Sequence, residues 1–163
     1  MLIGVVADTH DKAERLMAAI DALRTRGARC VIHCGDITNP EAVRACAGMP
    51  AYFVFGNNDR DRAGLRRAIA EIDGHCLEAS GELEIGGRRL AVTHGDDRKL
   101  VKRLMGTGPD YLFVGHAHRC VDRTEGDTRV VNPGALHRAA RWTFALLDLA
   151  TDELEYLTLP KPD

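Results

Sequence analysis

The chain has 163 residues, the size of one domain, and a chain of this length buries about 70% of its extended surface. It carries 22 basic and 24 acidic residues, and this balance argues against a nucleic-acid-coating protein or a polybasic membrane anchor. The apolar runs are far shorter than the ~20 residues of a membrane span, and we expect no signal peptide. The five cysteines form no CxxC pair, which favours reduced thiols and a cytoplasmic location.

The first part of the chain alternates apolar runs with amphipathic stretches, as is typical of a layered α/β fold. Apolar residues at helical spacing follow the first run, and Gly27 stands where that helix should end. Asn39 is expected to cap a second helix that has Pro40 in its first turn, and Asp61 to cap a third. The predicted strands of this part are residues 2–7, 30–34 and 51–55.

The second part of the chain is richer in strands. Gly86 and Gly87 suit a tight hairpin between residues 82–85 and 88–93, and one further helix precedes an apolar run at 111–114. Further strands are predicted at 120–124, 129–131, 143–149 and 154–159. The sequence therefore predicts two sheets packed face to face with helices outside, in a single domain of residues 1–163.

Five of the predicted strands end within a residue or two of a potential metal ligand. In α/β sheets, ligand sites form at the carboxyl ends of strands, so five separate loops are expected to deliver these groups to one edge. The five segments are Asp8-Thr9-His10, Gly35-Asp36, Gly56-Asn57-Asn58-Asp59, Thr93-His94-Gly95 and Gly115-His116-Ala117-His118.

These residue types predict a metal centre. Carboxylate, imidazole and carboxamide ligands without thiolate suit Mn²⁺, Fe²⁺, Zn²⁺ or Ni²⁺. Asp8 and His10 are separated by one residue and can bind one ion together, and the same holds for His116 and His118. The set is larger than one ion needs, and two ions bridged by a carboxylate suit in-line displacement at phosphorus. Glycines are expected to allow close approach of backbone at positions 35, 56, 95 and 115.

Together with Asn132-Pro133-Gly134, the five ordered segments resemble the calcineurin-like metallophosphoesterases, and in particular their small phosphodiesterase branch. The likeness covers residues 1 to about 150. It implies a four-layer α/β/β/α sandwich of two mixed sheets flanked by helices, which agrees with the two sheets inferred above.

The resemblance also implies a ligand set and a reaction. Asp8, His10 and His118 would hold one ion, and Asn57, His94 and His116 the other. Asp36 would bridge them. The implied cofactors are two divalent transition-metal ions per chain, Mn²⁺ being favoured over Ni²⁺, Fe²⁺ or Zn²⁺. The implied enzyme is a phosphoric ester hydrolase, more specifically a phosphodiesterase, in which a metal-bridging hydroxide attacks phosphorus and Asp36, Asn57 and His94 are catalytic.

One position departs from the family pattern. Larger members carry a histidine that protonates the leaving group where this chain has Asn58, and an amide has no titratable proton to give. A missing general acid costs about 10²- to 10⁴-fold with poor leaving groups and little with an acidic phenol. Asp59 would ordinarily orient that histidine, so its role is open. Asn58, Asp59 and Arg60 are weakly indicated substrate contacts, although a solvated helix face is the preferred interpretation of Arg60.

Four residues outside this set have plainer interpretations. His33 is expected to be packed or to support the ligands rather than bind metal. Cys34 is expected to be a buried structural thiol, because thiolate fits this oxygen and nitrogen set poorly. His75 and His137 carry no partner pattern and are interpreted as surface or loop residues.

Two alternative functions stay open from the sequence. The retromer scaffold subunit of eukaryotes resembles the same compact fold but acts as a binding module. An enzyme acting on a nucleotide polyphosphate or a phosphoprotein is the other alternative. The expected partner is a small phosphoester substrate, without a membrane and without a strong nucleic-acid signal, and a homodimer is left open.

Overall fold

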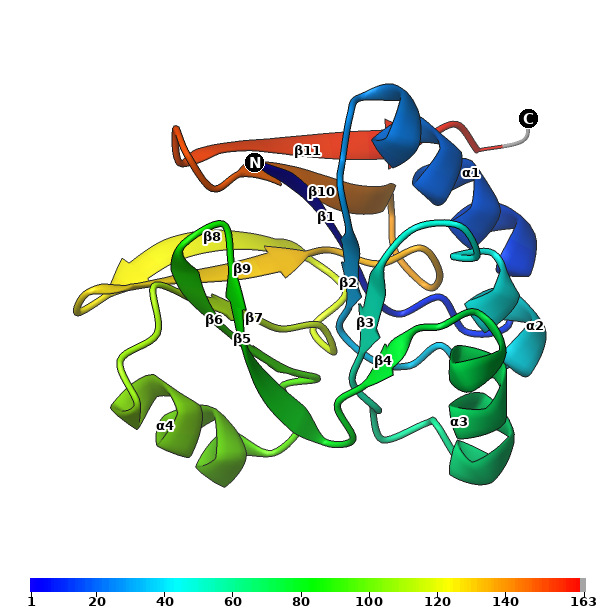
Figure 1. Cartoon of the computed structure of the whole chain (residues 1–163), viewed down its shortest axis with the longest axis horizontal. Coiled ribbons are helices and arrows are strands. Elements are labelled where there is room, and N and C mark those ends of the chain that lie inside the picture. Colours follow the sequence, from blue (N-terminus) through cyan, green and yellow to red (C-terminus); the bar gives the residue numbers. More distant parts are fainter. Residues whose placement is uncertain (162–163) are drawn as a thin grey trace.

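A computed structural model describes residues 1–161 and contains two sheets with helices outside them (Figure 1). The strands of the first sheet are β1 (Leu2–Val6), β2 (Val31–His33), β3 (Ala51–Phe53), β4 (His75–Cys76), β10 (Trp142–Asp148) and β11 (Glu153–Leu159). They lie in the order β11-β10-β1-β2-β3-β4. The four strands from β1 to β4 are parallel, whereas β10 runs antiparallel to both β1 and β11, so this sheet is mixed.

The second sheet is also mixed. Its strands are β5 (Ser80–Ile85), β6 (Arg88–Thr93), β7 (Tyr111–Phe113), β8 (Cys120–Glu125) and β9 (Thr128–Pro133). They lie in the order β5-β6-β7-β9-β8, in which the three central strands are parallel and the two outer ones antiparallel to their neighbours. The Gly86-Gly87 pair joins β5 to β6, as the sequence predicts.

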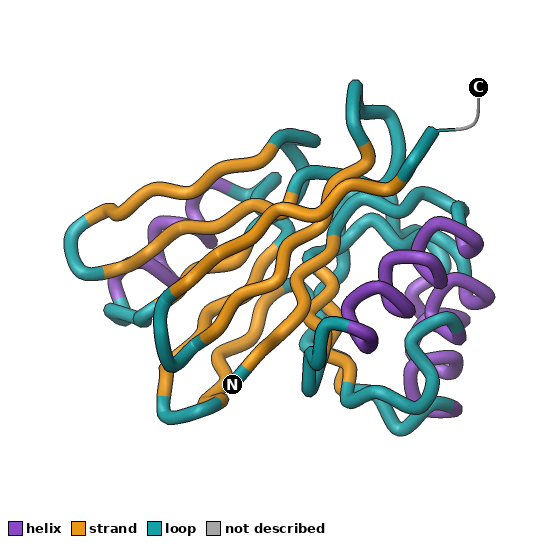
Figure 2. The backbone as a smooth tube through the Cα atoms, turned by 90° about the horizontal axis from the view of Figure 1, so that it is seen from above, coloured by secondary structure: helices purple, strands orange, loops and turns teal. Residues whose placement is uncertain are grey.

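Helices cover the outer face of each sheet. The four helices are α1 (Ala13–Thr25), α2 (Pro40–Arg44), α3 (Arg62–Glu71) and α4 (Arg98–Gly106). The first three gather on one side of the molecule and α4 lies on the other, as two views at right angles show (Figures 1 and 2). Within residues 1–161, no helix has both the length and the apolar character that a membrane crossing requires.

Alternation along β1 shows how the layers form. Ile3 and Val5 are fully buried between the two sheets, where they belong to the same apolar cluster as Val92 and Phe113 of the second sheet. The side chain of Val6 points the other way, into the cluster beneath α1, α2 and α3. A smaller apolar cluster lies between α4 and the second sheet. The chain is therefore an α/β/β/α sandwich, and the predicted fold class is confirmed.

The predicted helix caps are confirmed. The side chain of Asn39 accepts a hydrogen bond from the backbone N–H of Glu41 at the start of α2, and Pro40 stands in the first turn. Asp61 likewise accepts from Gly64 at the start of α3. Both caps satisfy backbone N–H groups that a helix leaves without partners at its first turn.

Two details differ from the sequence prediction. The two-residue strand β4 was not expected, because so short an edge segment carries no readable alternation, and it contains His75. Strand β9 extends to Pro133, so Asn132 lies inside a strand, where its amide donates a hydrogen bond to the carbonyl of Gly115 at 2.7 Å. Tertiary pairing sets both of these boundaries.

Replacing Gly4 by alanine is expected to destabilise the contact between β1 and α1. A Cβ at Gly4 would lie 2.5 Å from Cδ1 of Leu23, which is fully buried, so the helix must shift or Leu23 must change its conformation. Overpacking of this kind lowers the free energy of unfolding by about 1–3 kcal/mol. Urea denaturation of the Gly4→Ala chain measures the loss.

The matched control is the double variant Gly4→Ala with Leu23→Ala. Leu23→Ala alone costs about 2–5 kcal/mol through the cavity that it leaves. The added Cβ occupies part of that cavity, so the cost of Gly4→Ala should vanish in the double variant. Strictly additive costs would mean that the Gly4 and Leu23 positions are not in steric conflict.

Candidate metal centre

The loops that follow β1, β2, β6 and β7 are joined to one another by hydrogen bonds. The backbone N–H groups of Asp8 and His10 donate to the carbonyls of Gly35 and Asp36, both at 3.0 Å. In the second sheet, the N–H of Gly115 donates to the carbonyl of His94 at 2.9 Å. The two pairs of loops are connected to each other because the N–H of His116 donates to Asp8 Oδ2 at 3.0 Å. The predicted edge therefore exists, and both sheets contribute to it.

Two groups of ligand atoms lie at this edge. In each group, every residue offers one ligand atom, and these atoms lie within 4.8 Å of one another. The first group is Asp8, His10 and His118, and the second is Asp8, Asp36 and His94. Asp36 Oδ2 lies 3.6 Å from His10 Nε2 and 3.4 Å from His94 Nε2. Asp8 belongs to both groups, and Asp36 of the second group also lies close to His10 of the first, so its role as a bridging ligand stays a prediction.

Three of these atoms are buried without a hydrogen-bond partner among the described residues. They are Asp8 Oδ1, His10 Nε2 and His94 Nε2. A buried polar atom that is left unsatisfied costs about 1–3 kcal/mol, so a cluster of three requires an explanation. Divalent cations at this point would satisfy all three atoms at once, and the oxygen and nitrogen donors match the ions expected from the sequence.

Strained backbone accompanies the ligands. Five of the seven predicted ligands have a positive φ, a conformation that costs a residue with a Cβ about 1–2 kcal/mol. These are Asp8 (54°), His10 (44°), Asp36 (57°), His116 (65°) and His118 (52°). Strain that recurs in this way marks positions where function fixes the backbone.

Hydrogen bonds at Nδ1 orient two of the histidines. His94 Nδ1 lies 2.8 Å from the carbonyl of Cys34, and His118 Nδ1 lies 3.3 Å from the carbonyl of Arg138. A carbonyl can only accept, so both Nδ1 atoms carry the hydrogen and both Nε2 atoms face the cluster.

His33 supports the ligand loops from below, as predicted. Its Nδ1 accepts from the N–H of Gly35 at 3.2 Å, and its Nε2 therefore donates to Thr9 Oγ1 at 2.8 Å. Complete burial lowers the pKa of His33 to about 3, so the ring stays neutral. Cys34 is also fully buried, and burial raises the pKa of its thiol well above the ordinary value, as a structural cysteine requires.

Asn58 and Asp59 both act on Asp36. The backbone N–H and the side-chain amide of Asn58 donate to Asp36 Oδ1 and Oδ2 at 2.9 and 2.7 Å. Asp59 is buried, and its carboxylate accepts from the backbone N–H groups of Asp36, Gly56 and Thr38 at 2.7–2.8 Å. The structure therefore places Asp59 beneath the loops rather than at the surface where a substrate contact was expected.

Asn57, Arg60 and His116 lie at the exposed rim of the site. The ring of His116 lies 5.2 Å from that of His94, edge to face, whereas the two groups of close ligand atoms do not include it. The role of Asn57 and His116 as ligands of a second ion stays a prediction.

Two glycines let these loops approach closely. A Cβ at Gly56 would lie 2.2 Å from Asp36 Oδ1, and one at Gly35 would lie 2.7 Å from His94 Nδ1. Gly35 also has a φ of +92°, which side chains rarely allow. The close approach expected at these two positions is therefore observed, and it is what lets the loops from both sheets meet.

The protonation of the cluster reflects burial and proximity. Burial raises the pKa of Asp8 to about 6. Burial opposes protonation of His94, but the carboxylates of Asp36 and then Asp8 outweigh it and raise its pKa to about 9. For Asp36, burial is outweighed by His94 and by the amide of Asn58, which hold its pKa well below the ordinary value. Without a cation, His94 therefore carries a proton at neutral pH that a metal ion must displace.

A cleft of about 440 Å³ opens beside the ligands. Its walls are formed by His10, Asp11, Lys12, Thr38, Asn58, Arg60, Asp61, His137 and Arg138. The sequence interpretation of His137 as an ordinary surface or loop residue missed this position, although the residue lies only three places after the Asn132-Pro133-Gly134 segment. The ring of His137 lies 5.8 Å from that of His10.

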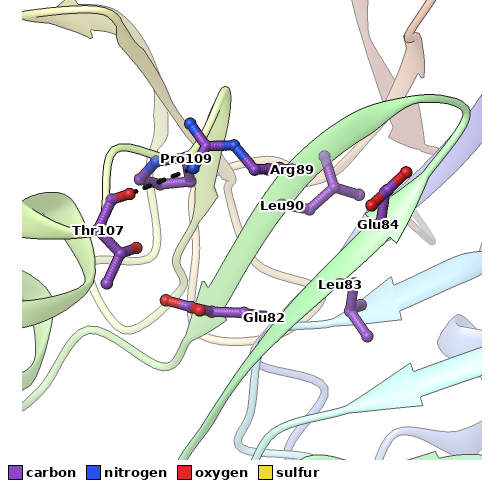
Figure 3. A pocket seen from close by; sticks show the side chains of 7 residues that line it. All are labelled: Glu82, Leu83, Glu84, Arg89, Leu90, Thr107 and Pro109. Atoms are coloured by element: carbon purple, nitrogen blue, oxygen red, sulfur yellow. Dashed lines mark hydrogen bonds between the residues drawn. The ribbon is translucent and has the colours of Figure 1, made fainter.

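A second hollow, of about 260 Å³, lies between the β5–β6 hairpin and the loop before β7 (Figure 3). Arg89 reaches across it and donates to the backbone carbonyls of Thr107 and Gly108. The only cation of its lining is thus already bound to the loop, and none of the predicted metal ligands belongs to that lining.

Comparison with known proteins agrees with this geometry. A family model described as the calcineurin-like phosphoesterase superfamily domain matches residues 1–152. The phosphodiesterase MJ0936 of Methanocaldococcus jannaschii is 28% identical over 138 residues, which are 82% of this chain and 83% of that protein.

Solved structures share the fold. A structure described as that of a novel archaeal phosphodiesterase has a TM-score of 0.90 and 26% identity, with 98% of this chain and 100% of that chain covered. Vps29 of Entamoeba histolytica, complexed with Zn²⁺, has a TM-score of 0.68 and 21% identity over 97% of this chain and 99% of that chain. At that identity, the second likeness concerns the fold alone.

The stability of the metal-free chain is expected to fall as the pH rises from 6.5 to above 9. His94 has a folded-state pKa of about 9 against an ordinary value of 6.5, so its proton stabilises the folded chain fully below pH 6.5. That stabilisation is lost as the pH rises through about 9. Urea denaturation at a series of pH values, in the presence of chelator, measures the decline.

His94→Gln provides the control, because it removes the titrating group and should flatten the curve over this window. A bound divalent cation replaces the proton, so metal-loaded protein should also lose the decline. A wild-type, metal-free curve that is flat or rises between these pH values would show that His94 is not held as a cation by Asp36.

Proposed function

The chain belongs to the calcineurin-like phosphoesterase superfamily and is a metal-dependent phosphoric ester hydrolase; from this premise we propose that it is a phosphodiesterase that uses two divalent ions. The observation that carries the two-ion proposal is the set of buried, unpartnered atoms of Asp8, His10 and His94 around the Asp36 carboxylate. When bound, such ions supply Lewis acidity toward the phosphoryl oxygens and an activated water nucleophile.

Two sets of residues would bind the two ions. Asp8, His10 and His118 would hold the first ion, and His94 with Asn57 and His116 the second. Asp36 would contact both, and the amide of Asn58 holds its carboxylate in place. The Nδ1 hydrogen bonds of His94 and His118 keep their Nε2 lone pairs directed at the cluster, which preserves the ligand geometry.

The cleft supports a small phosphoester as substrate. Lys12, Arg60 and Arg138 line it and can attract the anionic phosphoryl group, whereas Asp11 and Asp61 leave the net charge of the lining modest. A diester carries a single negative charge and suits such a lining better than a polyphosphate. The similarity of this chain to archaeal phosphodiesterases supports the same choice.

Three finer points complete the proposal. We take Mn²⁺ as the resident ion, because hard carboxylate oxygens and imidazoles make up the donor set. The five cysteines are all free and three are buried, which supports a cytoplasmic location. The small phosphoester is the expected partner, and a homodimer stays a prediction without an assigned interface.

A scaffold function is the competing proposal. The structural likeness to Vps29 supports it only at the level of the fold. A scaffold does not require buried ligand atoms that lack partners, so the geometry of Asp8, His10 and His94 favours an enzyme. Metal binding without turnover on any phosphoester would support the scaffold function instead of the enzyme.

Substrate preference after metal reconstitution tests the phosphodiesterase proposal. Protein stripped with chelator is reloaded with Mn²⁺, Ni²⁺, Fe²⁺ or Zn²⁺ in turn. Turnover is then compared on bis(p-nitrophenyl) phosphate and on p-nitrophenyl phosphate. We expect a higher kcat/KM for the diester with at least one ion, and no turnover without metal.

Asp36→Asn is the informative variant for this assay. It removes the charge between the two groups of ligands and is expected to lower kcat by about 10²-fold or more, the scale of losing one electrostatic contact in a reaction centre. Asp21→Asn is the matched control, because Asp21 is exposed on α1 and should behave as wild type. Preference for the monoester, or undiminished turnover by Asp36→Asn, would contradict the proposal.

A further inference from the structure

The cleft lacks the histidine that larger relatives place in the third segment, and Asn58 does not substitute for it. The backbone N–H and one N–H of the side-chain amide of Asn58 are directed at Asp36, which leaves one amide N–H. The remaining amide N–H has no titratable proton to give. A further donor in the cleft would favour hydrolysis of esters with poor leaving groups.

His137 is the histidine of the cleft that stands outside the ligand set. It is partly buried, it lines the cleft with Asn58, and its ring lies 5.8 Å from that of the ligand His10. Among residues 1–161, the hydrogen bonds of its ring involve Nδ1 alone. Nε2 is therefore left for a ligand in the cleft.

Arg15 fixes the tautomer of His137. Its Nη1 lies 3.0 Å from His137 Nδ1 and also donates to the carbonyl of Leu136 at 3.0 Å. A guanidinium can only donate, so Nδ1 must accept and the ring hydrogen must sit on Nε2. Burial, followed by the charges of Arg15 and Lys12, lowers the pKa of His137, which agrees with a neutral ring.

The guanidinium of Arg15 is itself held by Trp142. Its Cζ lies 3.5 Å from the centroid of the indole ring, and Trp142 begins β10. This cation–π contact fixes the direction from which Arg15 meets the loop after β9. The donor direction of His137 is thus set by Arg15 of α1, which is 122 positions away along the chain, and by Trp142 of β10.

We propose that His137 is a substrate-contacting catalytic residue that donates a hydrogen bond from its neutral Nε2–H to the leaving oxygen of the phosphodiester, with Arg15 as its positioning residue. This proposal rests on the proposed function of the cleft. The donor takes the place of the absent third-segment histidine but acts differently, because a ring that faces a guanidinium at Nδ1 does not carry a second proton.

The step balances without a proton from His137. One water adds to phosphorus while the bond from phosphorus to the leaving oxygen breaks, and that oxygen keeps the electron pair. The Nε2–H group stabilises the negative charge that develops on the oxygen. The proton released by the water then reaches the departed oxygen through solvent. This arrangement should matter most when the leaving oxygen is strongly basic.

The test compares two diesters whose leaving groups differ in basicity, diphenyl phosphate and bis(p-nitrophenyl) phosphate. His137→Leu removes the donor at similar size, and His137→Gln keeps an N–H group. We expect His137→Leu to lower kcat/KM by about 10²-fold on diphenyl phosphate, the scale of one oxyanion donor, and by less than about 10-fold on bis(p-nitrophenyl) phosphate. His137→Gln should recover part of the loss.

A binding measurement provides a readout that does not depend on turnover. Calorimetric titration of metal-loaded protein with inorganic phosphate should give a dissociation constant that His137→Leu raises about 2- to 10-fold, the worth of one neutral hydrogen bond. Metal content is measured for each variant. His75→Leu is the matched control, since His75 is exposed on β4 and stacks on Tyr52 outside the cleft, and it should match wild type.

The role of Arg15 is tested by the same comparison of kcat/KM on the two diesters. Arg15→Gln should weaken diphenyl phosphate hydrolysis more than bis(p-nitrophenyl) phosphate hydrolysis, and Arg15→Lys should restore part of the difference. A merely structural role of Arg15 or His137 would lower both rates equally.

Equal losses on both diesters, or wild-type rates and phosphate affinity in His137→Leu, would overturn the proposal for His137. Failure of the proposed function looks different, because wild-type protein would then hydrolyse neither diester. The phosphate titration would still decide in that case whether His137 contacts a phosphoryl group.

Discussion

The architecture of this site depends on one electrostatic constraint. Two buried carboxylates, Asp8 and Asp36, face the buried imidazoles of His10 and His94. Three of their atoms have no hydrogen-bond partner among residues 1–161, namely Asp8 Oδ1, His10 Nε2 and His94 Nε2. Burying polar and charged atoms without partners is costly. Divalent cations resolve the conflict, and the need to bind them explains why so unfavourable a cluster is maintained.

The fold supplies the rigidity that this cluster requires. Five of the predicted ligands stand in backbone turns with a positive φ, and hydrogen bonds join the loops of one sheet to those of the other. Gly35 and Gly56 permit a spacing that a Cβ would prevent. The strain is carried by strands whose side chains pack between the two sheets, so the stability of the core sustains the geometry of the site.

The sequence predicted the architecture well because its signals are local. Alternation and caps located the strands and helices, and polar residues after strand ends located Asp8, Asp36 and His94 at a common edge. The sequence did not predict that Asn58 binds Asp36, or that Asp59 lies beneath the loops. It also did not predict that His137 lines the cleft, where its contact with Arg15, 122 positions away, forms only in the folded chain.

Anomalous diffraction from crystals soaked in Mn²⁺ shows directly whether the buried cluster holds two ions. We expect two manganese peaks on either side of the Asp36 carboxylate, one beside Asp8, His10 and His118 and the other beside His94. An edge that stays free of manganese, or ions that bind only elsewhere on the chain, would contradict this expectation.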